Sequence, residues 1–254
     1  MRILGIIAMV AIITGCVKTM ANNDTSIDVM RFHDRRPGAS AKELLSDSQF
    51  YSLEVEVQYM EGYKPEAQTI HNLRAFLETY LRKPAGITIR QTKIESTGND
   101  ALSKEGVLQI EKTKRTSYST ESRMSMYILF TNGSHLDNRI LGMAYRNTSA
   151  VIFGGSVRNN SNLSGRLTRA ELQTAVLLHE VGHMIGLVNI GDEAATRDAV
   201  HNHCDNPRCL MYHATETKRL SSILVKGYIP VLDSACIASI KANGGKEGFR
   251  PEDQ

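Results

Sequence analysis

The sequence has little charge imbalance, no internal repeat and, beyond its first residues, no long apolar run. The formal net charge is only +3 and the basic residues are scattered, which argues against a nucleic-acid-binding surface. No stretch of 18 apolar residues follows the N-terminal segment, so no membrane-spanning helix is expected there. The composition is that of a globular protein, 41% hydrophobic and 22% charged, and 254 residues are enough to bury a substantial core.

The N-terminus has the form of an export signal. Arg2 precedes an apolar stretch over residues 3–13, and a small residue comes directly before Cys16. This segment resembles a bacterial lipobox, which implies removal of residues 1–15 and lipid attachment to Cys16. The rest of the chain would then be exported and tethered to a membrane of the cell envelope, at the outer membrane or cell surface. A plain signal peptide or short anchor is the alternative, and either would still export the chain.

The export signal precedes a polar segment and then a folded domain. Residues 16–48 are polar and mixed, with an Arg-Arg-Pro-Gly cluster at 35–38, and we expect them to form the lipid-attached tether. The domain is expected over residues 49–254, with an N-terminal subdomain at about 49–186 and a smaller C-terminal one at about 187–245.

Within the domain, strand-like and helix-like apolar patterns alternate. Strands are expected at residues 53–59, 86–94, 124–131, 140–145 and 150–153, and helices at 65–82 and 103–114. A polar loop is expected over residues 155–165. The pattern favours an α/β (α+β) fold, a mixed sheet with flanking helices. Strand order cannot be read from the sequence, so residues 150–154 form either an internal strand or an edge that pairs with an extended peptide.

The clearest chemical motif is His-Glu-x-x-His at residues 179–183. On a helix, His179 and His183 project from one face a turn apart, so their imidazoles can bind one zinc ion. Glu180 lies beside the first histidine, where it can act as a general base on a metal-activated water.

The residues around this motif predict a helix at about 168–185. Thr168 and Glu171 have the spacing of a capping box, and apolar residues follow at helical spacing. Gly186 fits the position that ends a helix. The histidines are therefore expected on a regular helix.

A catalytic zinc site commonly uses three protein ligands and one open position, so one more donor is needed. The candidates after the motif are Asn189, Asp192, His201 and His203. An amide oxygen such as that of Asn189 is a poor zinc ligand.

Residues 203–211 read His-Cys-x-x-x-x-Cys-x-Met. This order resembles the archaemetzincins, a family of zinc peptidase-like proteins in which the third histidine runs directly into a cysteine. The resemblance implies that His203 is the third ligand and that residues 189–202 are an insertion, with Asn189, Asp192 and His201 as the alternatives. It also implies a zincin-type active-site helix followed by a smaller C-terminal subdomain, in a layout that covers about 50–240.

The same resemblance suggests a role for Met211. It matches the methionine turn that lies beneath the metal in metzincins, where the side chain packs and does not bind the ion. Several metzincins have a tyrosine two residues later that helps to stabilise the oxyanion. This chain has Tyr212 one residue later and His213 two residues later, so that role is not transferred.

Archaemetzincins also hold a second, structural zinc through the two cysteines and a later C-x-x-C. Here aspartate replaces the first cysteine of that later motif, so the resemblance points to a site made by Cys204, Cys209, Asp233 and Cys236. Zinc accepts carboxylate but prefers thiolate. In the alternative, Asp233 only caps a C-terminal helix, and Cys204 and Cys209 form a disulfide in the exported protein.

These features indicate a membrane-tethered, zinc-dependent endopeptidase that acts on peptide or protein substrates with Glu180 as its general base. The expected cofactor is Zn²⁺, one catalytic ion and a second structural one. An alternative is a non-catalytic, zinc-stabilised binding or structural lipoprotein, and a further one is hydrolysis of a non-peptide amide. Glu180 argues against the non-catalytic alternative, because a structural site gains nothing from a carboxylate outside its ligand set.

Overall fold

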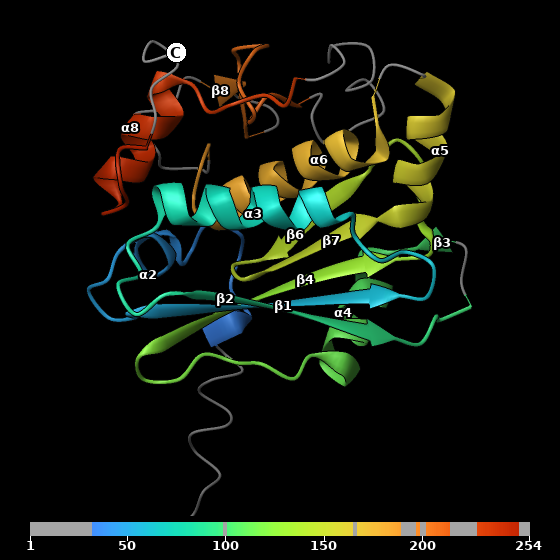
Figure 1. Ribbon diagram of the computed structural model, residues 1–254, viewed down its shortest axis with the longest axis horizontal. Coiled ribbons are helices and arrows are strands. Elements are labelled where there is room, and N and C mark those ends of the chain that lie inside the picture. The colour runs from blue at the N-terminus through green and yellow to red at the C-terminus, as the bar shows by residue number, and fades with distance from the viewer. Residues whose placement is uncertain are drawn as a thin grey trace, which may run out of the picture.

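A five-stranded sheet lies at the centre of the computed structural model (Figure 1). The structure describes residues 32–98, 101–164, 167–188, 197–198, 202–213 and 228–248. The strand order is β2-β1-β4-β7-β6, with the bounds β1 Ser52–Met60, β2 Ile87–Ile94, β4 Arg123–Thr131, β6 Gly142–Arg146 and β7 Ser149–Phe153. Only β6 runs antiparallel to its neighbour. The predicted strands and the mixed α/β class are confirmed.

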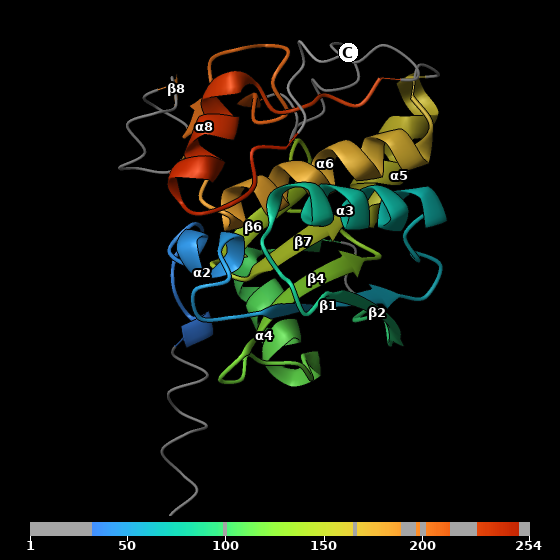
Figure 2. The same ribbon diagram turned by 60° about the vertical axis from the view of Figure 1, so that its left-hand side comes forward.

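Helices cover both faces of this sheet (Figures 1 and 2). Helices α3 and α6 lie side by side on one face, and α4 lies on the other; their bounds are α3 Ala67–Tyr80, α4 Lys104–Lys114 and α6 Arg169–Met184. The remaining elements are α2 Ala41–Leu45, α5 Gly154–Ser164, α8 Ser234–Ala242 and two short pairs, β3 Ala101–Leu102 with β5 Ser134–His135 and β8 Arg197–Asp198 with β9 His203–Cys204. Among the residues described, no helix is long and apolar enough to cross a membrane.

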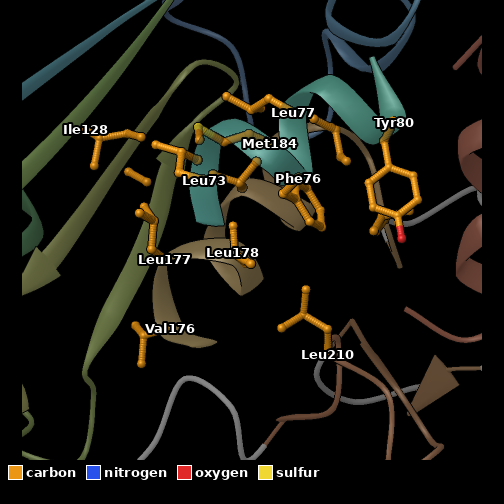
Figure 3. Packing of buried hydrophobic residues seen from close by; sticks show 14 of the residues in the cluster. Leu73, Phe76, Leu77, Tyr80, Ile128, Val176, Leu177, Leu178, Met184 and Leu210 are labelled. Atoms are coloured by element: carbon orange, nitrogen blue, oxygen red, sulfur yellow. The ribbon is translucent and has the colours of Figure 1, made fainter. Parts of the chain in front are cut away.

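Strand β4 is buried on both faces and separates two cores. Met126, Ile128 and Phe130 belong to the larger core beneath α3 and α6. The alternate residues Tyr127 and Leu129 belong to a smaller core beneath α4. This is the expected result when both faces of a parallel strand are covered by helices. Figure 3 shows the larger core, in which Leu73 of α3 lies near Leu177 of α6 and Leu77 of α3 lies near Met184 of α6.

Residues 154–164 form a helix, so the predicted polar loop over 155–165 is wrong. A Cβ on Gly154 would lie 2.5 Å from the carbonyl oxygen of Thr131, and a Cβ on Gly155 would lie 2.9 Å from that of Asn132. The two glycines therefore allow α5 to begin in close contact with the end of β4. In the sequence they resemble loop residues.

The edge of the sheet is β6 and not β7. Strand β7 pairs with β4 on one side and with β6 on the other. Residues 150–154 therefore form the internal strand, and the alternative, in which they pair with an extended peptide, is wrong. The two strands form a hairpin, and because β7 pairs with β4, the earlier strand β6 lies on the outside.

The folded domain begins earlier than residue 49. His33, Leu44 and Leu45 are buried, and residues 41–45 form helix α2, so the part of the predicted tether over 32–48 is a packed segment. The Arg35 guanidinium donates to the carbonyl oxygen of Phe32 and to the Ser40 hydroxyl, which makes the polar cluster a folded turn.

Candidate metal centres

Helix α6 carries the His-Glu-x-x-His motif, and the sequence sets both of its ends. The Thr168 hydroxyl accepts from the backbone N–H of Glu171, and the Glu171 carboxylate accepts from that of Thr168, which is the predicted capping box. Gly186 follows the helix with φ +94°, a conformation that favours glycine. A Cβ at Gly186 would also lie 2.5 Å from the Cβ of Ala41 in α2. The predicted helix is therefore confirmed, and its end contacts the N-terminal segment.

The structure brings His179, His183 and His203 together. One ligand atom from each ring lies within 4.8 Å of those of the other two. The Nε2 atoms of His179 and His183 are 3.1 Å apart, and the rings of His179 and His203 stack with centroids 5.2 Å apart. Four-coordinate zinc with ligand bonds of about 2.0–2.1 Å places its nitrogen ligands roughly 3.4 Å apart, so these residues fit a zinc ion.

Two further features suit these histidines to metal binding. His179 donates from Nδ1 to the carbonyl oxygen of Leu210 over 2.8 Å, which directs Nε2 toward the other rings. Burial lowers the pKa of His183 to about 3, with a smaller contribution from His203. The ring is therefore neutral at pH 7 and can offer a lone pair to a cation.

Gly182, inside the motif, is required by the methionine that packs beneath the helix. A Cβ at Gly182 would lie 2.3 Å from the Sδ atom of Met211. Met211 is fully buried, and its carbonyl oxygen accepts from the N–H of Cys204 over 2.9 Å. Met211 thus packs under the histidine helix, as the resemblance implies.

Glu180 is held by the edge strand, an interaction that the sequence did not reveal. The N–H of Ala144 donates to Glu180 Oε2 over 2.6 Å. A Cβ at Gly142 would meet the Glu180 side chain at 3.0 Å and Val176 at 2.6 Å, so only glycine lets β6 pass this close to α6. The available signal was Gly142, a glycine inside the apolar run over residues 140–145.

The three described cysteines form a second cluster with Asp233. All four ligand atoms lie within 4.8 Å of one another, and none of these cysteines is disulfide-bonded. The Sγ atoms of Cys209 and Cys236 are 3.7 Å apart. Zinc–sulfur bonds of about 2.3 Å place tetrahedral thiolates roughly 3.8 Å apart, so this donor set also fits zinc.

Two groups in this cluster have properties that favour a cation. Hydrogen bonds from the Cys204 and Cys236 thiols lower the pKa of Cys209, which favours the thiolate that zinc binds. Asp233 caps α8 by accepting from the N–H of Cys236 at Oδ1, while Oδ2 lies 3.1 Å from Cys204 Sγ. The sequence left the cap and the cluster as alternatives for Asp233, and the structure shows both at once.

Several predicted residues lie outside or beside these centres. Cys16, Asn189, Asp192 and His201 lie outside the described residues. The ring of His213 is 6.5 Å from that of His203 and 4.3 Å from that of Tyr212, with both side chains partly buried.

The fold is an α/β architecture in which the helix with the two histidines packs on one face of a mostly parallel sheet. The protein is similar to the crystal structure of archaemetzincin from Methanopyrus kandleri, with a TM-score of 0.51 and 15% identity over 76% of this chain and 96% of that one. It also matches metalloproteinase-II from Bacteroides fragilis at a TM-score of 0.40 and 14% identity, over 80% of this chain and 60% of that one. No protein-family model and no curated sequence matches the chain. The fold is thus archaemetzincin-like.

Proposed function

We propose that this protein is a zinc-dependent peptidase. The observation that carries the proposal is the convergence of His179, His183 and His203 beside Glu180, a carboxylate that the three-histidine set does not need as a ligand. Three protein ligands leave one position open, as catalytic zinc sites require. The archaemetzincin-like fold agrees with this arrangement.

In this mechanism the protein's own groups orient the reactants and move the proton. A bound zinc ion supplies Lewis-acid polarisation of the scissile carbonyl and acidifies a water molecule. The hydrogen bond from Ala144 holds the Glu180 carboxylate in place. Glu180 accepts the proton from the attacking water on a carboxylate oxygen and delivers it to the leaving nitrogen.

The edge strand supports a peptide or protein as the substrate. Strand β6 is one of the two edge strands of the sheet and passes directly beside Glu180. An extended peptide can pair with such an edge through its main chain, which requires no particular side chains. This placement favours peptide bonds over other amides as the target.

We also propose that the enzyme is exported and anchored to the membrane through lipid on Cys16. The basic and apolar N-terminal segment supports this location.

The second cluster, in turn, is proposed to hold a structural zinc ion. Its support is the donor set of three thiols and a carboxylate with zinc-like spacing.

Replacing Glu180 with glutamine tests the catalytic role. Because the amide cannot accept the proton, cleavage of a diverse peptide mixture, followed by mass spectrometry, should fall at least about 100-fold. Zinc content should remain that of the wild type, since Glu180 is not a ligand in this account. Glu61→Gln, at an exposed site, is the matched control and should cleave normally. Wild-type turnover in Glu180→Gln would favour the non-catalytic, zinc-stabilised alternative.

A further inference from the structure

One short loop joins the two candidate metal centres. His203, of the histidine centre, is followed directly by Cys204, of the cysteine cluster. At the other end of the loop, Cys209 is separated by Leu210 alone from Met211, which packs beneath the histidine helix. Each end of the loop therefore places a ligand of the cysteine cluster next to a residue that binds or supports the histidine centre.

The backbone of Leu210 is held by hydrogen bonds on both its C=O and its N–H. Its carbonyl oxygen accepts from His179 Nδ1, and its N–H donates to the carbonyl oxygen of Val231, each over 2.8 Å. The next residue, Met211, donates its N–H to Cys209 Sγ over 3.4 Å. The acceptor that orients His179 is thus positioned by neighbours of the cysteine cluster.

The opposite side of the cluster fixes the segment that contains Val231. Asp233, two residues later, caps α8 through Oδ1 and lies against Cys204 and Asn206 through Oδ2. Among the described residues, backbone pairing between these two segments is limited to one bridge, which joins Cys209 to Val231. A shared cation would therefore be a main connection between the 203–211 loop and the 231–236 segment.

We infer that the cluster of Cys204, Cys209, Asp233 and Cys236, when it holds zinc, positions two of the three ligands of the histidine centre. It fixes His203 through the adjacent Cys204, and it fixes His179 through the Leu210 carbonyl. The filled cluster consequently raises the zinc affinity of the histidine centre, because partners that orient a ligand contribute to metal binding. This inference rests on the proposed zinc peptidase.

The test measures zinc affinity at the histidine centre in the full-length chain. Each metal-stripped protein first receives one equivalent of Cd²⁺, which prefers thiolates, and cadmium-113 NMR establishes where that ion is bound. The zinc dissociation constant of the remaining centre is then measured by competition with a chelator. The variants are Cys236→Ala, which removes a thiolate, and Asp233→Asn, which removes the carboxylate and keeps a residue that caps helices.

The inference predicts a dissociation constant about tenfold higher in Cys236→Ala, in the range found when ligand-orienting partners are removed, and a smaller rise in Asp233→Asn. Ile240→Val, a buried change in α8 outside the cluster, should leave it unchanged. Asp233→Asn keeps the comparison decisive if Cys236→Ala does not fold.

Two outcomes separate this inference from the proposed function. Equal zinc affinity of the histidine centre in the wild type and in both cluster variants overturns the coupling and leaves the peptidase proposal intact. A wild-type protein that binds no zinc at the histidines overturns both.

Discussion

At the scale of single residues, the histidine centre depends on close contacts that only glycine permits. Gly182 lets Met211 pack against α6, and Gly142 lets β6 approach Glu180. In both cases the sequence has glycine within an element, where it costs about 1 kcal/mol of helix or strand stability. The site therefore contains two locally unfavourable residues whose contribution lies in the packing around the histidines and the carboxylate.

Gly182→Ala should weaken both the fold and zinc binding. The new methyl group would lie 2.3 Å from Met211 Sδ, and such overpacking costs about 1–3 kcal/mol, more than the gain in helix propensity. Chemical unfolding and zinc competition measure the two effects. Gly106→Ala in α4 is the matched control, since its Cβ would meet Leu102 at an ordinary 3.5 Å and should stabilise the protein. Equal behaviour of the two variants would refute the packing argument.

His33 should make the protein less stable in mild acid. Burial, followed by the charges of Arg115, Arg35 and Arg146, lowers its pKa to about 3, and Nε2 accepts from the N–H of Ser119. Between pH 6.5 and about 3 the unfolded chain binds a proton that the folded one does not, so stability falls as the pH falls through this range.

Replacing His33 measures this contribution. Between pH 7 and pH 5 the wild type should lose about 2 kcal/mol of unfolding free energy through this residue, and His33→Gln should lose correspondingly less. His71→Gln removes an exposed histidine and is the control. The same pH slope in the wild type and His33→Gln would show that His33 contributes nothing.

At the scale of elements, periodicity predicted most of the sheet and the helices, because burial sets the apolar spacing of each element locally. It failed at α5, where Gly154 and Gly155 meet the end of β4 and the segment that follows it, and before α2, where the backbone N–H of Arg35 donates to the distant Asn147 side chain. It also could not order the strands, since β7 and β6 have similar apolar patterns and their positions depend on pairing with β4.

The N-terminal segment that contains α2 should be essential for folding. Leu44 and Leu45 are fully buried, and Lys83 donates from Nζ to the carbonyl oxygens of Glu43 and Ser46. A chain that begins at Gln49 should therefore melt more than about 10 °C below one that begins at Val17, because burial of two leucines alone contributes several kcal/mol. Lys42→Ala, at an exposed position of α2, is the control. Equal melting temperatures of the two chains would restore the tether interpretation.

At the scale of the whole molecule, the sequence predicted which residues meet at the metal centres. It did not predict the hydrogen bonds that hold these residues in position. His179 and His183 follow from helix geometry, and His203 with the cysteines came from the resemblance to archaemetzincins. The hydrogen bonds of Leu210 with His179 and of Ala144 with Glu180 join residues more than 30 positions apart. Such contacts depend on the complete fold, so local patterns could not predict them.

The most direct test of this account is a zinc-edge anomalous diffraction map of crystals of residues 17–254, prepared with zinc supplied. The account predicts a peak bound by His179, His183 and His203, with Glu180 beside it and outside the ligand set. The Nε2 atoms of His179 and His183 are 3.1 Å apart, and a ring nitrogen of His203 lies within 4.8 Å of a nitrogen of each. A map with no zinc at these histidines, or with Asn189, Asp192 or His201 in place of His203, would contradict it.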